Sequence, residues 1–140
     1  MYQVVIDTNV LVAALLSNRG ASHRLLRLVG DRRWRINLSV PLVLEYEQTL
    51  KRVCTGASLG GSDIDSVVCF LCANANLRPI FFLWRPLLPD PKDDFVLELA
   101  VESRADFLIT FNTRDFVDAE RFGVRVISPR EFLAIIGEIP

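Results

Sequence analysis

The sequence predicts an α/β fold, a three-layer α/β/α sandwich with a central parallel sheet. Three observations lead to this expectation. Short segments rich in β-branched apolar residues alternate along the chain with segments of helical periodicity, the pattern of parallel strands joined by crossover helices. The chain has 140 residues, a length that suits one domain. No internal repeat, low-complexity segment or linker breaks the alternation, so residues 1–140 are expected to form a single domain.

Five segments have the composition of strands. The first contains a run of valine and isoleucine and ends abruptly at Asp7. Continuous apolar runs of this kind are typical of parallel strands that are covered on both faces. The expected strands are Tyr2–Ile6, Trp34–Leu38, Arg78–Leu83, Asp106–Thr110 and Val124–Ile127.

The segments between the strands are expected to be helical. Thr8 or Asn9 can cap the first helix, and Ser128 with Glu131 fits a capping box before the last. The segment Trp84–Lys92 holds three prolines and is not expected to be regular helix. The expected helices are Val10–Leu16, Ser22–Val29, Val40–Val53, Asp63–Ala73, the segment from Asp93 or Asp94 to Arg104, and the segment that begins at Pro129.

The composition is that of a soluble globular protein, with 51% hydrophobic and 24% charged residues. The apolar surplus fits either a dimer interface or strands that are buried on both faces. No apolar run reaches the roughly 20 residues that span a bilayer, and the first residues do not resemble a signal peptide. A cytoplasmic protein without membrane contact is therefore expected.

The three cysteines, Cys54, Cys69 and Cys72, do not predict a disulfide framework, because their number is odd. Cys69 and Cys72 form a C-x-x-C pattern inside an apolar stretch. A zinc site needs four ligands, and the chain offers one further cysteine and one histidine, His23. Buried reduced thiols are expected, and a redox or metal role is the alternative.

The net charge of −1 gives no general attraction to nucleic acid, so an RNA substrate would depend on where the basic residues lie. Two groups of basic residues are close in sequence. They can form either a contact surface for RNA or ordinary solvated helix faces. The groups are Arg24, Arg27, Arg32, Arg33 and Arg35, and then Lys51 and Arg52.

Acidic and amide side chains follow two of the expected strands. Asp7 follows the first strand, Asn112 and Asp115 follow the strand 106–110, and Asp93 and Asp94 begin the helix that leads into that strand. Because parallel strands end at the same edge of the sheet, where ligands bind, these groups are expected to converge.

Several carboxylates packed together raise one another's pKa values and destabilise a fold. A divalent cation removes that cost, and carboxylates with retained waters are what Mg²⁺ accepts. The chain has only His23, which argues against a Ser-His-Asp hydrolase. Each acid also has a structural alternative: Asp7, Asp93 and Asp94 as turn or helix caps, Asp115 as a loop residue, and the helical Glu45 and Glu47 as part of a solvated face.

Four segments, in order and at suitable spacing, resemble the PIN-domain family, in particular its VapC-like branch of toxins from toxin–antitoxin systems. The resemblance covers nearly the whole chain. The segments are VVIDTNVLV at residues 4–12, LSVP with LEY within residues 38–46, DPKDD with LELA within residues 90–100, and ADFLITFNTRDF at residues 105–116.

This resemblance implies a Mg²⁺- or Mn²⁺-dependent endoribonuclease with an RNA substrate, a cognate antitoxin protein as partner, and a homodimer. It makes Asp7 the first metal ligand and catalytic residue, supported by Thr8 and Asn9. It selects Glu45 as the second acid, whereas the helical wheel alone does not distinguish Glu45 from Glu47.

The resemblance also implies a third and a fourth acid. Counting back from Thr110 favours Asp94 as the third, with Asp93 as the alternative. Some relatives carry Asp where this chain has Asn112, so Asp115 is expected to be the charged member there, with Thr110 and Asn112 in support. Fewer charges weaken metal affinity, which leaves open whether one or two ions bind.

Two other functions are compatible with parts of the sequence. A phosphatase or phosphotransferase of the haloacid-dehalogenase type would use Asp7 as nucleophile, but it requires a second aspartate where Asn9 stands. A PIN fold without catalysis could serve as an RNA- or protein-binding module, although Asp7 and Glu45 are both present. Metal-dependent RNA cleavage that is lost in Asp7→Asn separates these possibilities.

Overall fold

The computed structural model describes residues 1–56, 59–79 and 91–140, with the backbone alone for residues 91–94. Its centre is a five-stranded sheet in which every neighbouring pair of strands is parallel and the order is β3-β2-β1-β4-β5. The strands are β1 (Tyr2–Ile6), β2 (Trp34–Leu38), β3 (Ala75–Leu77), β4 (Phe107–Ile109) and β5 (Arg125–Ile127).

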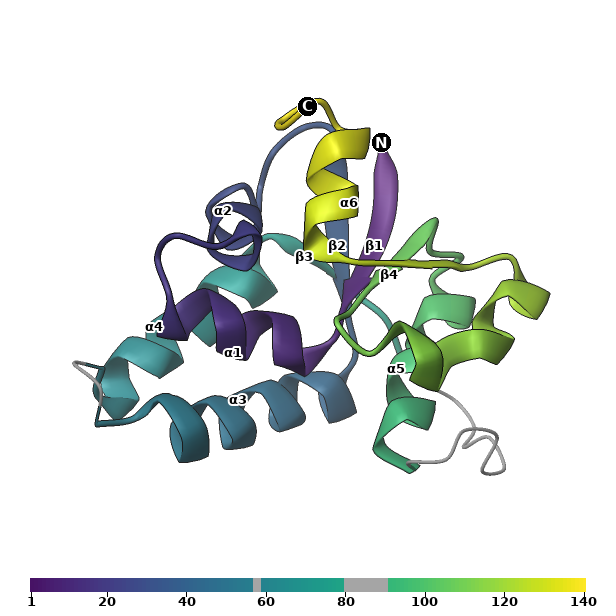
Figure 1. The fold of residues 1–140 in the computed structure, drawn as a ribbon. Helices are drawn as coiled ribbons and strands as arrows, with labels where there is room; N and C mark the ends of the chain where they lie inside the picture. Colours follow the sequence, from purple (N-terminus) through teal and green to yellow (C-terminus); the bar gives the residue numbers. More distant parts are fainter. Residues whose placement is uncertain (57–58, 80–90) are drawn as a thin grey trace.

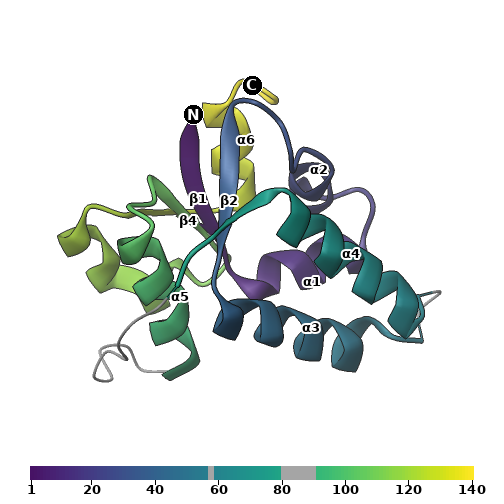
Figure 2. The same ribbon diagram turned by 180° about the vertical axis from the view of Figure 1, so that it is seen from behind.

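Helices cover both faces of this sheet, which confirms the predicted three-layer sandwich. Figure 1 shows α1, α2, α3 and α4 on one side of the strands and α5 on the other, and Figure 2 shows the same layers from behind. The last helix packs against α2, and the 3-10 segment η1 packs against β5 and α5. The helical elements are α1 (Thr8–Leu16), α2 (Ala21–Arg27), α3 (Val40–Cys54), α4 (Gly61–Ala73), α5 (Pro91–Glu102), η1 (Thr113–Phe122) and α6 (Pro129–Ile135).

An aromatic cluster fixes α6 over the beginnings of three strands. The ring of Phe132 meets Tyr2, Trp34 and Phe107 edge to face, with centroids 6.4, 5.4 and 5.7 Å apart. Each such pair adds about 0.5–1.5 kcal/mol beyond the burial of apolar area. Because these three residues open their strands, α6 is held at the amino-terminal half of the sheet.

The register of the sheet places Asp7 opposite Thr110. Ile6 pairs with Ile109 across β1 and β4, so the next residue of each strand lies at the same level. The chain first adds β2 and β3 on one side of β1 and later adds β4 and β5 on the other. The strand order therefore reverses between β1 and β4, and in open parallel sheets ligands bind at the carboxyl ends of the strands at such a point.

The predictions for the third strand and for the start of the following helix are wrong where the structure describes them. The third strand is Ala75–Leu77, and Arg78 and Pro79, the described part of the predicted strand Arg78–Leu83, lie outside it. Arg78 still donates its N–H to Leu38, but Pro79 has no N–H to continue the ladder, and residues 80–83 lie outside the described part of the chain. The predicted irregular segment 84–92 falls largely on undescribed residues, and α5 begins within it, at Pro91. Asp93 and Asp94 thus lie inside the first turn of α5 and do not cap it.

The capping predictions had mixed outcomes. Ser128 and Glu131 form the expected capping box of α6, with bonds of 3.1 and 3.2 Å. The cap of α1, however, is Asp7 rather than Thr8 or Asn9. The 3-10 segment η1 was not predicted. No helix in the described ranges is long and apolar enough to cross a membrane.

The cysteines are all free, as expected, but only one is fully buried. Cys54 lies in the core, Cys72 is half-buried and Cys69 is exposed on α4. The prediction of buried thiols is therefore wrong for Cys69, because the apolar stretch that contains it is an amphipathic helix whose outer face carries that residue.

Candidate active site at the carboxyl ends of β1 and β4

Asp7 occupies the turn between β1 and α1 and uses both carboxylate oxygens. The N–H of Thr8 donates to Oδ1 at 2.9 Å, and the hydroxyl of Thr110 donates to Oδ2 at 2.7 Å. Asp7 is only 7% exposed. Since a carboxylate oxygen accepts more than one bond, both oxygens can still bind a further donor or a cation.

Glu45 meets Asp7 through a single residue. The hydroxyl of Thr8 donates to Oε2 of Glu45 at 2.7 Å, while the N–H of the same threonine binds Asp7. Glu47, which the helical wheel could not separate from Glu45, instead pairs with Lys51 at 3.2 Å. The structure therefore brings Glu45, and not Glu47, to the end of β1.

Tyr46 attaches α3 to the same point of the sheet. Its hydroxyl donates to the carbonyl oxygen of Ile6, the residue before Asp7, and the side chain is fully buried. Burial raises the pKa of Tyr46 well above its ordinary value, with smaller contributions from Asp7 and Glu45, so the phenol stays protonated. Sequence analysis missed this role, although a tyrosine in a buried aliphatic stripe usually needs a hydrogen-bond partner.

The segment that follows β4 contributes further residues to the candidate site. Thr110 is fully buried, and its hydroxyl oxygen accepts the N–H of Asn112 at 3.0 Å while it donates to Asp7. The carbonyl of Asn112 then accepts the N–H of Asp115 at 3.0 Å. Asn112 is exposed and Asp115 is half-buried in the first turn of η1.

Like charges accumulate around Asp7. Burial is the main cause that raises the pKa of Asp7 above 3.8, and repulsion from Glu45 and Asp115 raises it further. The hydrogen bonds from Thr110 and Thr8 work in the opposite direction. None of the ion pairs within the described ranges includes Asp7, Glu45 or Asp115, so no described side chain neutralises them.

The donors present suit a hard divalent cation. Mg²⁺ is usually bound through one or two carboxylates and keeps several waters, and Asp7 with Glu45 offers such a pair. The side-chain oxygen of Asn9 is buried and has no hydrogen-bond donor among the residues that the structure describes, which suits a bound water. No three Asp, Glu, His or Cys side chains in the described ranges form a group that could hold a metal.

The expected third acid cannot be placed by its side chain. Asp93 and Asp94 belong to the first turn of α5, the helix that leads to β4, but their side chains lie outside the described part of the structure. One helical turn beyond Asp94, Glu98 is a buried carboxylate, only 3% exposed. Sequence analysis did not single out Glu98, since its place in an apolar helix gave no separate signal.

Comparisons with known proteins agree with this fold. The family model described as PIN domain matches residues 3–114. VapBC2 from Rickettsia felis, bound to a DNA fragment from its promoter, matches with a TM-score of 0.61 and 14% identity over 89% of this chain and 98% of that chain. VapBC-1 from nontypeable Haemophilus influenzae matches with a TM-score of 0.59 and 17% identity over 91% of this chain and 98% of that chain.

No curated protein matches the sequence. At identities of 14% and 17% the two structural matches establish a shared fold.

Proposed function

The chain belongs to the PIN-domain family, and from this premise we propose that it is a metal-dependent endoribonuclease, the toxin of a toxin–antitoxin pair. One observation carries the proposal. Thr8 joins Asp7 and Glu45 at the carboxyl end of β1, where the strand order of the sheet reverses. Asp7 is buried and Glu45 is half-buried, and an acidic pair at a ligand-binding edge favours chemistry over a purely structural role.

The proposed ligands of Mg²⁺ or Mn²⁺ are Asp7 and Glu45, with Asp94 or Asp93 and Asp115 completing the acidic set. When bound, the cation would generate a nucleophilic water at neutral pH and offset the charge that develops on the scissile phosphate. The buried oxygen of Asn9 is suited to orient a water beside the acids. Whether one or two ions bind depends on the contribution of Asp115.

The surrounding residues hold the acids in place before any ligand arrives. Thr110 donates to one oxygen of Asp7 and is itself held by the N–H of Asn112. Thr8 fixes Asp7 with its backbone and Glu45 with its hydroxyl. Partners of this kind orient metal ligands, and their loss typically costs about 10–100-fold in affinity or activity.

The proposal includes two protein partners in the cytoplasm: an antitoxin that restrains the nuclease, and a second copy of the chain. Both similar structures are described as VapBC, which supports the first. The content of 51% hydrophobic residues in 140 supports the second, since an apolar surplus can cover an interface. Size-exclusion chromatography with light scattering measures the copy number directly.

Cleavage of a generic single-stranded RNA tests the activity. We expect the purified protein to cut RNA with Mn²⁺ or Mg²⁺ and to stop in EDTA. Asp7→Asn and Glu45→Gln should each lose activity by about 100-fold or more, beyond the effect of a supporting residue. The matched control is Glu47→Gln, the same chemical change on the same helix, because Glu47 faces Lys51.

Circular dichroism checks that every variant is folded. Loss of cleavage in Asp7→Asn and Glu45→Gln, but not in Glu47→Gln, supports the nuclease. Undiminished cleavage by folded Asp7→Asn, or equal cleavage in EDTA, contradicts it. A wild-type protein that binds RNA but never cuts it would instead favour a binding module.

A further inference from the structure

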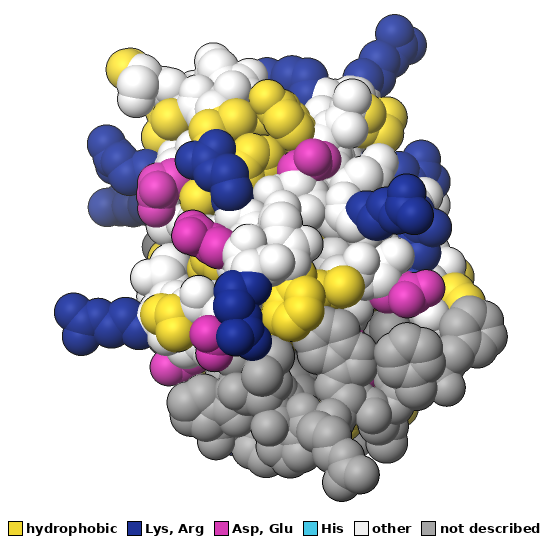
Figure 3. Space-filling view, turned by 90° about the vertical axis from the view of Figure 1, so that its right-hand side faces the viewer, with side chains coloured by type: hydrophobic (Ala, Val, Ile, Leu, Met, Phe, Trp, Pro, Cys, Tyr) yellow, Lys and Arg dark blue, Asp and Glu magenta, His cyan; other side chains and the backbone are white. Residues whose placement is uncertain are grey.

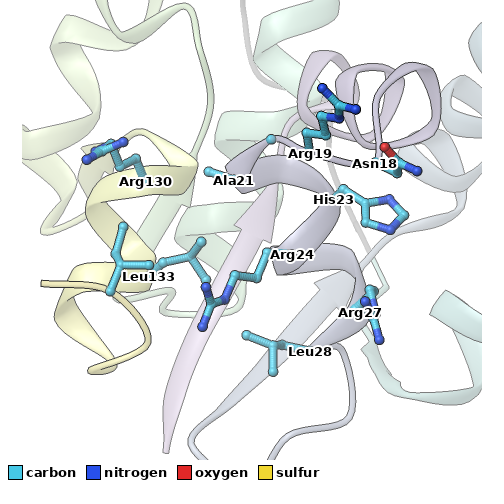
Figure 4. Close-up of a pocket in the computed structure, with 11 residues that line it drawn as sticks. Asn18, Arg19, Ala21, His23, Arg24, Arg27, Leu28, Arg130 and Leu133 are labelled. Carbon is cyan, nitrogen blue, oxygen red and sulfur yellow. The ribbon is translucent and has the colours of Figure 1, made fainter.

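A basic pocket lies away from the carboxylates, between α2 and α6 and beside the turn before α2. It has a volume of about 570 Å³, and no Asp or Glu lines it. In Figure 4, α6 contributes one wall and α2 the other. The chain as a whole carries a net charge of −1, so this pocket is a local concentration of positive charge. The basic residues that line it are Arg19, His23, Arg24, Arg27 and Arg130.

The arginines of the pocket differ in whether they form hydrogen bonds or ion pairs with other residues of the chain. Arg24 donates to the carbonyl of Glu138 at 2.9 Å and pairs with its carboxylate at 3.1 Å, so it fixes the end of the chain as part of the pocket. The guanidinium groups of Arg19, Arg27 and Arg130 have no hydrogen bond or ion pair with any residue in the described ranges. Each offers five N–H donors.

Two basic residues outside the pocket are compensated by acids. Arg33 pairs with Asp31 and Glu138, and Lys51 pairs with Glu47 and Asp65. On the face shown in Figure 3, basic side chains lie among acidic ones and form no continuous stripe. The pocket differs because Arg19, Arg27 and Arg130 border it from different sides (Figure 4) and have no acidic partner among the described residues.

Apolar side chains complete the lining. Leu28, Leu133 and Ile139 border the same hollow, and in Figure 4 Arg24 reaches toward Leu133. Guanidinium groups bind phosphates, whereas an apolar wall adds nothing for a simple inorganic anion but can cover a base. The volume of about 570 Å³ lies in the range of small-ligand sites, roughly 300–1,000 Å³.

We propose that this pocket binds successive nucleotides of a single-stranded RNA, with separate phosphates on the arginines of α2 and α6 and a base against the apolar wall. The inference rests on the proposed nuclease function and specifies its substrate. The RNA must be a strand that extends beyond the cleavage point and enters the pocket.

The topology connects the pocket to the acidic site. The first helix begins next to Asp7 and ends at Leu16, and the pocket lining starts two residues later, at Asn18. The nine residues of α1 span about 14 Å at 1.5 Å per residue. At roughly 3.4 Å per stacked nucleotide, about four nucleotides separate the carboxylates from the pocket.

The test measures binding instead of cleavage. Asp7→Asn protein in EDTA is titrated with a labelled eight-nucleotide RNA over a range of salt concentrations. The double variant Arg27→Ala/Arg130→Ala is compared with Arg32→Ala/Arg52→Ala, which removes two other exposed arginines that do not line the pocket. All four side chains are on the surface, so both double variants are expected to fold, and thermal unfolding verifies it.

We expect the pocket variant to bind about ten-fold more weakly or worse, because two charge-assisted contacts are lost. The slope of log K against log salt should become less negative by about 1.4, or about 0.7 for each phosphate contact with a single strand. The control pair should change affinity by less than about two-fold and should leave most of the slope in place.

Three competitors identify the source of the phosphate. Inorganic phosphate and adenosine monophosphate should compete far more weakly than the eight-nucleotide strand, and a polyglutamate peptide should not depend on the pocket arginines. Tight binding of the mononucleotide would mean a free nucleotide, and pocket-dependent binding of polyglutamate would mean an acidic protein segment; either result overturns the proposal.

Failure of this inference is distinct from failure of the nuclease. If the pocket variant and the control pair bind RNA equally while Asp7→Asn abolishes cleavage, the RNA subsite is wrong and the nuclease stands. If Asp7→Asn still cleaves RNA, the proposed acidic site is wrong. The binding titration is done in EDTA, where no metal-dependent cleavage occurs, so it still tests the pocket separately.

Discussion

Two polar networks occur in the same sheet, and they differ in charge and in completeness. Toward the middle of the strands, the side-chain oxygen of Gln3 accepts a bond from Asn37 and another from Asn76, each at 3.0 Å. Asn37 in turn accepts a bond from Arg78 at 3.2 Å. This network links β1, β2 and β3, and none of its buried side-chain atoms in the described ranges lacks a hydrogen-bond partner.

The carboxylate network at the ends of β1 and β4 has the opposite character. Asp7 is buried and repelled by Glu45 and Asp115, and the oxygen of Asn9 is buried without a donor in the described ranges. The donors of this network, from Thr8 and Thr110, bind carboxylates. The donors of the first network bind amide oxygens. A satisfied network without like charges stabilises a fold, whereas clustered carboxylates destabilise it unless a ligand compensates their charge. Substitutions in each network separate these two roles.

Thr110→Val should have the largest effect among the supporting residues. It removes the bond to Oδ2 of Asp7 and should reduce cleavage by about 10–100-fold. Because that bond lowers the pKa of Asp7, the acidic limb of the pH–activity profile should move to higher pH. Thr110→Ser keeps the hydroxyl and is the control; equal activity of the valine variant would mean that the bond has no catalytic value.

Asn37→Ala should act on stability alone. Asn37 is fully buried. Its loss removes the acceptor of Arg78 and one of the two bonds to Gln3, which should lower the free energy of unfolding by about 1–3 kcal/mol. Urea unfolding measures this, and RNA cleavage per folded molecule should stay unchanged. A large loss of activity in the folded variant would show that the two networks are not separate.

Tyr46→Phe should have a smaller effect on both properties. The variant keeps the ring and loses the bond to the carbonyl of Ile6, so we expect a loss of about 1 kcal/mol in the free energy of unfolding. Activity should fall only modestly, because Thr8 still joins Asp7 to Glu45. If activity fell as far as in Glu45→Gln, the tyrosine would have a more direct role.

Asp7→Asn should give the smallest change in the free energy of unfolding. The informative result is whether the variant is more or less stable than the wild type. The folded state raises the pKa of Asp7, so the folded protein holds that proton more tightly than the unfolded chain does. The ionised carboxylate therefore destabilises the fold, and this cost develops as the pH rises from the unfolded pKa of about 3.9 through the raised folded value.

Without metal, Asp7→Asn should accordingly be more stable than the wild type at pH 7. Asparagine can still cap α1, so little else is lost. The difference should vanish near pH 3.5, where Asp7 is protonated in both states. Urea unfolding in EDTA at the two pH values measures it, and a less stable variant at pH 7 would mean that the hydrogen bonds of Asp7 outweigh its burial and repulsion.

Local signals explain what the sequence predicted well. The first strand and the capping box at Ser128 and Glu131 depend on neighbouring residues, and both are confirmed. The parallel sheet followed from the alternation of segments. The rule that parallel strands end at one edge predicted that Asp7 lies near Asp115, which contributes to the electrostatics of Asp7; it did not predict the bond from Thr110.

Features that depend on distant residues were not predictable. The helical wheel left Glu45 and Glu47 equal, and only the meeting of α3 with Thr8 distinguishes them. The short strand β3 is defined by its pairing with β2, and its own residues carry little strand signal. The basic pocket joins α2 to α6, which are far apart in sequence, so the early group of arginines gave no indication of their shared site.

Binding of Mn²⁺ tests the central claim, that Asp7 and Glu45 share a divalent cation. Titration calorimetry on the wild type, Asp7→Asn, Glu45→Gln and the control Glu47→Gln reads the site without RNA. We expect the wild type and Glu47→Gln to bind Mn²⁺ alike, and the other two variants to lose about ten-fold or more in affinity. Equal affinity of the wild type and Asp7→Asn would contradict the account.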